Sequence, residues 1–327
     1  MGTWPATTES PAGTDIGRLG SQNMDDTANG AIEFGIVTGQ HWRSWETILD
    51  QWRWAEATGW DSAWVFDHFF SLRPDDTGQT LDGWSLLAGL ATQTQRLRIG
   101  ALVTGVTHRH PSVLLKQAVT ADHLSSGRLI LGLGAAWNER EHEAYGLPFP
   151  APGQRVDMLG ETLELQQLFE TQDRTTFNGD HYRIDDAPFE PKPVNGHMPV
   201  MIGTSGKRML RHVARYADYW DSGRQPEDIP ELAAQVDGHC EEFGRDPAEI
   251  RRAISAYCEP SSNPNAPIID WTQSNAEVER DVRDHVARYA QAGVRMFLFN
   301  IPTDAPNAQL DYVAREVFPG LRREFSG

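Results

Sequence analysis

The chain has 327 residues, of which 39% are hydrophobic, so one domain with a large core is expected, near the upper size range of α/β barrels. Its 29 basic and 46 acidic residues give a formal charge of −17, which disfavours nucleic acids and anionic membranes as partners. The two cysteines, Cys240 and Cys258, are too few for a disulfide framework or a cysteine-based metal site, which suits a reducing cytoplasm. No apolar run approaches the roughly 18–20 residues that span a bilayer.

Residues 1–30 are rich in Gly, Thr, Ser, Asp and Pro and show no hydrophobic periodicity. Such a segment cannot bury an apolar face, so a disordered tail is expected there. It lacks the cationic start and the apolar stretch of a secretory signal, so secretion is not expected. Residues 31–327 are expected to form the folded domain.

From residue 31 onward, short apolar runs alternate with longer segments of helical pattern, which favours a parallel sheet with crossover helices. Eight runs are candidate strands, and eight is the number in a (β/α)8 TIM barrel, the expected fold. An open doubly wound sheet is the alternative. The candidate strands are 31–38, 62–66, 96–103, 128–134, 199–203, 219–223, 251–258 and 294–300.

The helices expected between these strands have recognisable starts. Trp45, Ile48, Leu49 and Trp52 form an amphipathic stripe, and Ser44 stands where a helix N-cap would. Pro111 suits the first turn of a later helix.

The gap between the fourth and fifth strands is longer than the others. It contains a helical pattern over 153–170 and then FNGDHY (177–182), in which Asn178-Gly179 between aromatic residues indicates a hairpin. We expect this insertion to lie over the mouth of the barrel.

Active sites of such barrels lie where the strands end, so the residues that follow each apolar run are the candidates for chemistry. The second run ends in Asp67 and His68. A histidine exchanges protons near neutral pH, and a neighbouring carboxylate can orient it. His68 is therefore a candidate acid or base; in the structural alternative, Asp67 caps a helix or a turn.

The third run continues into ALVTGVTHRHP (101–111), which carries Thr104, His108, Arg109 and His110. A helix that begins at Pro111 would offer free N–H groups, and the cationic side chains could face an anionic ligand. An ordinary strand-to-helix turn with exposed charges explains the segment equally well.

The fifth run continues into IGTSGKRML (202–210). Gly203 and Gly206 allow close approach to the backbone, Thr204 and Ser205 supply hydroxyls, and the following helix would direct its positive end at a phosphate. This loop is the best phosphate-binding candidate in the chain.

Several better-known motifs are excluded by single positions. A P-loop fails because Met201 and Arg208 occupy its Gly and Ser/Thr positions, and a Rossmann fingerprint fails at Trp137. The histidines show no zinc-ligand spacing, so no metal is expected. A metal-dependent hydrolase that uses Asp67 and His68 stays an alternative without a matching ligand set.

Four segments in order, VFDHFF (65–70), GALVTGVTHRHP (100–111), GRLILGLGAAWNEREHEAYGLPF (127–149) and PVMIGTSGKRMLRHVARYADYW (199–220), resemble the luciferase-like flavin and deazaflavin oxidoreductases. The resemblance is greatest to the branch that uses coenzyme F420, and it covers residues 31–325. It implies a (β/α)8 barrel with the flavin-like ring of the cofactor in its mouth.

The resemblance also implies roles for individual residues. His68 would be the catalytic acid or base, and Asp67 would contact the cofactor. A non-prolyl cis peptide would lie against the ring near Ala101, Leu102 and Val103, with Thr104 close to the pyrimidine edge of the ring. The other implied cofactor-binding residues are Trp137 and Asn138 beside the pocket, and Gly203, Thr204, Ser205 and Gly206 at the phosphate.

The chain departs from the sugar-phosphate dehydrogenases of this branch, which carry a Trp four residues beyond the His and an acid soon after the fourth strand. Here Leu72 holds the first place, and Trp137 lies near the second. A sugar-phosphate substrate is therefore not expected. The aromatic side chains of Phe69, Phe70 and Trp137 suit a flatter, less polar one.

Flavin mononucleotide (FMN) and coenzyme F420 both present a ring and a phosphate, but F420 also carries an acidic oligoglutamate tail. Lys207, Arg208 and Arg211 would form a basic rim for that tail, which favours F420. The expected function is hydride transfer between F420 and a small organic substrate, by a homodimer. The alternatives are an FMN-dependent monooxygenase that uses reduced flavin and oxygen, and a non-catalytic cofactor-binding protein.

Overall fold

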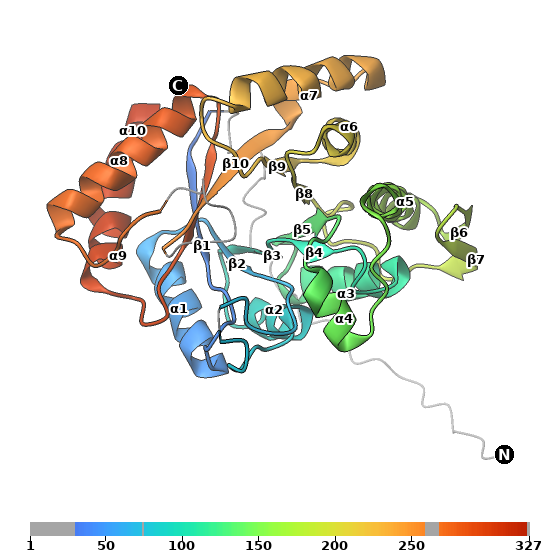
Figure 1. The fold of residues 1–327 in the computed structure, drawn as a ribbon, viewed down its shortest axis with the longest axis horizontal. Helices are drawn as coiled ribbons and strands as arrows, with labels where there is room; N and C mark the ends of the chain where they lie inside the picture. The colour runs from blue at the N-terminus through green and yellow to red at the C-terminus, as the bar shows by residue number, and fades with distance from the viewer. Residues whose placement is uncertain (1–29, 74, 259–267, 326–327) are drawn as a thin grey trace, which may run out of the picture.

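The structure, a computed structural model, describes residues 30–73, 75–258 and 268–325. The expected tail therefore lies outside the described residues, apart from Gly30. Eight parallel strands close into a barrel because β3 pairs with both β2 and β5 (Figure 1). This confirms the predicted TIM barrel over an open doubly wound sheet. The barrel strands are β1 (Glu33–Val37), β2 (Ser62–Val65), β3 (Arg98–Ala101), β5 (Leu129–Gly134), β8 (Val200–Gly203), β9 (Tyr219–Asp221), β10 (Arg251–Ala256) and β11 (Met296–Asn300).

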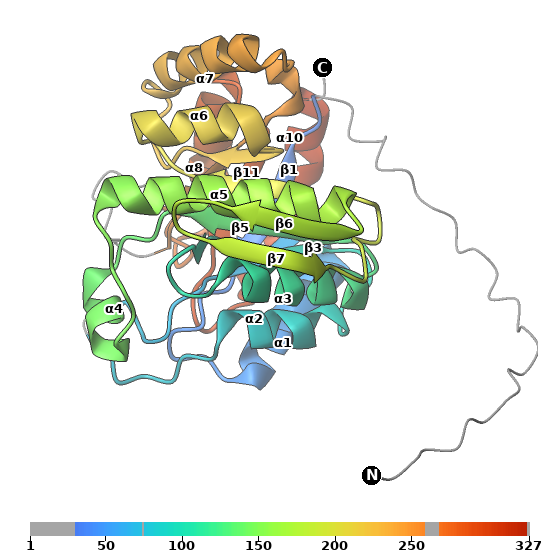
Figure 2. The same ribbon diagram turned by 90° about the vertical axis from the view of Figure 1, so that its right-hand side faces the viewer.

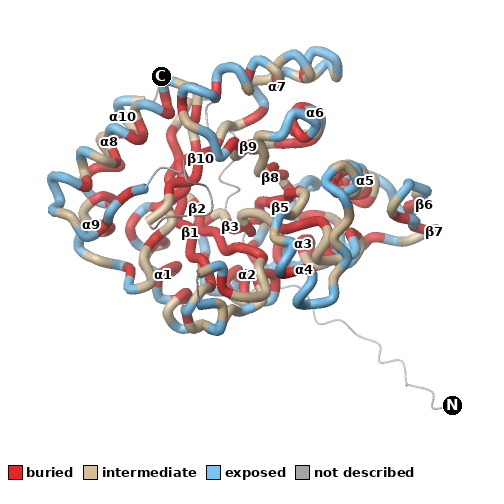
Figure 3. The backbone as a smooth tube through the Cα atoms, in the orientation of Figure 1, coloured by how far each residue is buried: buried red, intermediate tan, exposed pale blue. Residues whose placement is uncertain are grey.

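Helices surround the barrel, and their outer sides are exposed while the strands are buried (Figure 3). The predicted start of the first helix is confirmed, because the Ser44 hydroxyl accepts a hydrogen bond from the Thr47 N–H at 3.2 Å. Pro111 opens its helix, as predicted. The helices are α1 (Trp45–Thr58), α2 (Gly83–Ala91), α3 (Pro111–Leu124), α4 (Glu139–Tyr145), α5 (Pro152–Thr171), α6 (Lys207–Tyr216), α7 (Ile229–Phe243), α8 (Asn275–Gln291), α9 (Ala308–Tyr312) and α10 (Phe318–Phe325), with a 3-10 turn at Pro247–Glu249 and a π-helical turn at Val313–Val317.

The barrel interior is filled by side chains of the strands. Trp64, Ile130, Met201 and Leu298 belong to this inner cluster, separate from the larger core between strands and helices. Gly100 leaves room for the indole of Trp64, since a Cβ there would lie 2.5 Å from a ring carbon. The packed interior leaves the ends of the strands as the place for a ligand.

The insertion after β5 is present, but its hairpin is not where the sequence placed it. Strands β6 (Arg174–Asn178) and β7 (Arg183–Pro188) pair antiparallel, which confirms the hairpin. The hairpin lies on the outer side of the molecule beside α5 (Figures 1 and 2), and the Glu161 carboxylate of α5 accepts the N–H of Tyr182 at 2.9 Å. The expectation that the hairpin lies over the mouth of the barrel is therefore wrong. The helix α4, earlier in the insertion, reaches the mouth instead.

No helix in the described ranges is long and apolar enough to cross a membrane. Those same ranges contain no group of three or more His, Cys, Asp or Glu side chains placed to hold a metal ion.

Candidate active site

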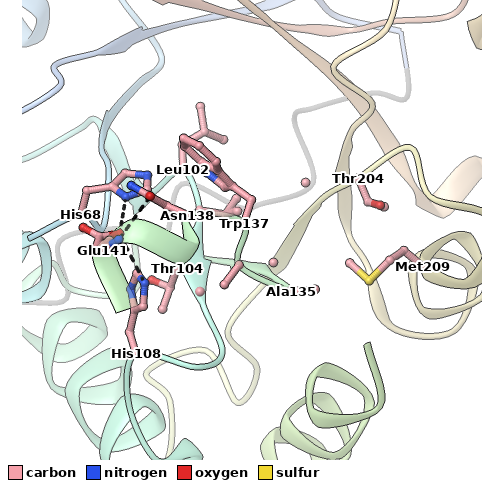
Figure 4. A pocket seen from close by; sticks show the side chains of 15 residues that line it. His68, Leu102, Thr104, His108, Ala135, Trp137, Asn138, Glu141, Thr204 and Met209 are labelled. Atoms are coloured by element: carbon pink, nitrogen blue, oxygen red, sulfur yellow. Dashed lines mark hydrogen bonds and ion pairs between the residues drawn. The ribbon is translucent and has the colours of Figure 1, made fainter. Parts of the chain in front are cut away.

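Two adjoining cavities, of about 330 and 370 Å³, open where the barrel strands end. We call them the first and the second cavity; Figure 4 shows the first. They share five lining residues, which are His68, Leu102, Val103, Trp137 and Gly203. The residues predicted at four different strand ends therefore meet in one site.

His68 is held by a carboxylate that the sequence reasoning missed. The imidazole Nδ1 lies 2.8 Å from Oε2 of Glu141, which is fully buried. The other oxygen, Oε1, accepts the N–H of Phe69 at 2.5 Å, so the carboxylate is fixed at both ends. Glu141 lies in the first turn of α4, whose N-cap is Asn138. An acid three residues after an Asn N-cap is an ordinary helix start, so nothing in the sequence linked Glu141 to His68.

The charge on Glu141 is stabilised by histidines on two sides. Burial raises the pKa of Glu141, but the hydrogen bonds from His68 and the Phe69 N–H and the charges of His68 and His108 outweigh it, so the net pKa is lowered. Nε2 of His108 lies 3.8 Å from the same oxygen that His68 contacts (Figure 4). Glu141 is therefore an anion that fixes the orientation of the His68 ring.

Asp67 lies behind this wall and lines neither cavity. Its carboxylate accepts from Arg109 at 2.6 Å, and Nδ1 of His108 is 3.5 Å away. Burial raises the pKa of Asp67, but these two partners outweigh it and lower the net value. Its position argues against the expected direct contact with the cofactor. Asp67 is also not the N-cap of the next helix, α2, because Asp82 has that role. Arg109 also pairs with Asp82 at 2.8 Å, so its charge is used within the protein.

The expected cis peptide is present, at Leu102–Val103. These two residues line both cavities, whereas Ala101 is buried and lines neither. Thr104, in the short strand β4 (Thr104–Gly105), lines the first cavity, and its hydroxyl accepts from the indole of Trp84 at 2.9 Å. A flat ring placed in the mouth would meet this segment.

The loop after β8 brings the predicted phosphate-binding residues to the edge of the first cavity. Gly203 and Thr204 line it, while Ser205 and Gly206 follow at the start of α6. Gly206 is the N-cap and has no side chain, so no side chain caps the first N–H groups of α6. These N–H groups are a suitable site for a phosphate.

The expected basic rim is weaker than the sequence suggested. Arg208 pairs with Asp157 at 2.7 Å, and Arg211 pairs with Glu242. Two of the three positive charges of the basic rim are therefore balanced by acidic residues of the protein itself. Lys207 is exposed and has no ion-pair partner among the described residues.

Trp137 and Asn138 both lie at the mouth, as expected. The indole of Trp137 is 55% exposed, and its ring centroid is 5.6 Å from that of His68, in an edge-on arrangement. Phe69 and Phe70 line neither cavity, which corrects the expected aromatic wall. Both pack toward Tyr145 of α4 instead.

The second cavity is more polar than the sequence predicted. Its far wall holds Asp221, which ends β9 and accepts from the Ser255 hydroxyl at 2.8 Å. Burial raises the pKa of Asp221, and it raises the pKa of the neighbouring Tyr257 to about 12. On the opposite side, burial and the positive charges of His68, Arg73 and Arg43 lower the pKa of His41 to about 3. The expected preference for a less polar substrate is therefore not supported by this wall.

Comparison with known proteins places the chain among oxidoreductases. Over 246 residues it is 30% identical to an uncharacterised protein of Mycobacterium tuberculosis, covering 75% of this chain and 78% of that protein. It is 27% identical over 310 residues to the F420-dependent glucose-6-phosphate dehydrogenase of Intrasporangium calvum, covering 82% and 92%. An F420-dependent secondary alcohol dehydrogenase, solved with an F420-acetone adduct, shares the fold with a TM-score of 0.77 at 19% identity, covering 89% and 99%. Residues 26–267 match the model of the luciferase-like monooxygenases, and the chain belongs to this family.

Proposed function

We propose that this protein is an F420-dependent oxidoreductase that transfers a hydride between the deazaflavin and a small organic substrate. The observation that carries the proposal is the meeting of a carboxylate-held histidine, the Leu102–Val103 segment and the glycine loop after β8 in one mouth. A proton-exchanging group beside sites suited to a ring and a phosphate is what hydride transfer to an organic molecule requires. Relatives that use F420 support the choice of cofactor.

Residues of both cavities fit such a cofactor. Leu102, Val103 and Thr104 would contact the ring, Trp137 and Asn138 would flank it, and the loop from Gly203 to Gly206 would hold the phosphate with the N–H groups of α6. When bound, the deazaflavin supplies the hydride-transferring carbon; its chemistry is limited in practice to two-electron steps.

His68 would exchange the proton that accompanies the hydride. Its Nδ1 is bonded to Glu141, so the other ring nitrogen, Nε2, is the atom available to a substrate. When the substrate is reduced, His68 gives a proton to the atom that gains negative charge; in oxidation it takes that proton back. Glu141 holds the ring in place through its contact with Nδ1.

A runner-up is an FMN-dependent monooxygenase, which the description of the matching family favours. The same mouth would accept the ring and phosphate of FMN. The non-catalytic alternative, a cofactor-binding protein, needs no histidine in the cavity. It therefore does not explain why Glu141 holds His68 there.

The first test is a fluorescence titration of the purified protein with oxidised F420 and, separately, with FMN. We expect micromolar or tighter binding of F420 and none of FMN. Preference for FMN would favour the monooxygenase, and the reduced flavin would then be tested for oxygen consumption. If neither cofactor binds, the proposed function is wrong.

The second test replaces His68 by Ala. Turnover of F420 with the best substrate from a panel of alcohols, ketones and enones should fall by about 10²–10⁴-fold. The affinity for F420 should stay nearly unchanged. His123→Ala, at an exposed histidine of α3, is the matched control and should have no effect. Unchanged turnover in the His68 variant would rule out its role as acid or base.

The homodimer and the cytoplasmic location stay predictions. Light scattering during size-exclusion chromatography and cell fractionation test them.

A further inference from the structure

A concave site of about 440 Å³ lies at the end of the barrel opposite the candidate active site, where the strands begin. Arg251, Arg252 and Arg295 line it together with Gly293 and the 3-10 turn at Pro247–Glu249. Three guanidinium groups in one cavity are unexpected on a chain with a formal charge of −17.

The fold itself brings these arginines together. Arg251 and Arg252 open β10, and Arg295 directly precedes β11. The N–H of Arg295 donates to the carbonyl of Arg252 at 2.9 Å, so the two strand starts are neighbours. Gly293 leaves space for one guanidinium, since a Cβ there would lie 2.7 Å from Nη1 of Arg252.

The acids around the cavity do not balance this charge. Glu33 contacts Arg251 at 3.1 Å but also pairs with the partly buried Arg98, and Asp237 lies 3.4 Å from Arg252. The three guanidinium groups of the cavity thus face two carboxylates, one of which is shared with Arg98. The Nη1 of Arg295 donates to the carbonyls of Ala290 and Val294, each at 2.9 Å, and no described carboxylate lies within ion-pair distance of this side chain.

Donor capacity is also left over. The Nε atoms of Arg251 and Arg295 are buried and have no hydrogen-bond partner among the described residues. Burial lowers the pKa of Arg295, and the charges of Arg251 and Arg252 lower it further. The pairs that Glu33 makes with Arg98 and Arg251 can be explained as ion pairs between strands, at the end where the barrel strands begin. That role does not explain why Arg295 lies beside two like charges. Buried donors and excess charge of this kind are typical of sites that take an anion.

We propose that this cavity binds a small molecule with two negative charges, through a phosphate or carboxylate group held by Arg252 and Arg295. The planar guanidinium matches the paired oxygens of both groups. The cavity volume suffices for a small metabolite. The site is separate from the proposed catalytic mouth and does not depend on the function proposed for it.

Calorimetric titration of the full-length protein with phosphate, pyrophosphate and malonate, at constant ionic strength set with chloride, tests this. We expect saturable binding of at least one of these anions, and their ranking decides between a phosphoryl and a carboxylate ligand. Arg295→Gln and, separately, Arg252→Gln should weaken binding about tenfold or more. Arg280→Gln is the control, because Arg280 is an exposed arginine of α8 whose ion-pair partner among the described residues is its neighbour Asp281.

A measurement on the unaltered protein guards against misfolded variants. Arginine modification by phenylglyoxal, read by mass spectrometry, should be slowed at Arg252 and Arg295 by the bound anion and unchanged at Arg280. Absence of saturable binding by all three anions overturns the proposal. So does binding that survives in both variants, because the anion then lies elsewhere, for example at the glycine loop of the active site.

Discussion

At the scale of single residues, the contact between His68 and Glu141 has the clearest consequence. The variant Glu141→Gln keeps the size of the side chain but removes the negative charge that lies against Nδ1 of His68. We expect turnover of F420 to fall about tenfold or more, with the affinity for F420 kept. Steady-state rates and a fluorescence titration with F420 measure both effects.

Glu143→Gln is the matched control, because Glu143 lies on the same helix and is exposed. It should leave the rate and the affinity for F420 unchanged. A loss of F420 affinity together with the loss of rate in the Glu141 variant would contradict a role through His68 and indicate a packing defect instead.

Residue positions at strand ends were predictable, while contacts between them were not. His68, Thr104, Trp137 and Gly203 all reach the mouth, because each lies at or shortly after the end of a buried strand whose apolar run is easy to recognise. Glu141 and Asp221 were missed, since their importance comes from partners 73 and 34 residues away. The family resemblance implied that Asp67 contacts the cofactor, but successive side chains after a strand point in different directions, and Asp67 faces Arg109.

At the scale of elements, His197 joins three parts of the barrel wall. Its Nδ1 lies 2.8 Å from Glu170 of α5, and its Nε2 lies 3.1 Å from Asp218, which precedes β9. Asp218 also accepts the N–H of Val200 at 2.7 Å, at the start of β8. The hydrogen bonds to Asp218 and Glu170 raise the pKa of His197 from 6.5 to about 10.

A raised pKa in the folded state means that folding favours protonated His197. Its contribution to stability is therefore complete below pH 6.5 and decreases as the pH rises from 6.5 to about 10. The variant His197→Gln should be less stable than the unaltered protein below pH 6.5, and the difference should shrink as the pH approaches 10. Urea unfolding of both proteins at several pH values measures it. A difference that is independent of pH would contradict an ionic role for His197.

The elements also show which features of the fold local sequence patterns do not predict. The eight strands and the hairpin were predicted because apolar runs and an Asn-Gly turn are local signals. The place of the hairpin was not, because it depends on contacts such as the one between Glu161 of α5 and the N–H of Tyr182. A turn signal determines how two strands meet, but it does not determine the surface on which they pack.

At the scale of the whole molecule, net charge and local charge make opposite predictions about the proposed cofactor. The acidic tail of F420 would be attracted by a basic rim and repelled by the overall charge of −17. Because Arg208 and Arg211 are paired with Asp157 and Glu242, the rim provides little free positive charge. Repulsion by the whole molecule should therefore prevail for the tail.

We accordingly expect F420 to associate faster as the ionic strength rises from about 0.02 to about 0.2 M, since salt shortens the screening length from roughly 20 Å to below 10 Å. The acceleration should be larger for coenzyme with a longer oligoglutamate tail, because more negative charge is screened. Stopped-flow fluorescence with two tail lengths measures this. Slower association at high salt would show that the basic rim attracts the tail after all, and Lys207→Gln would then remove that attraction.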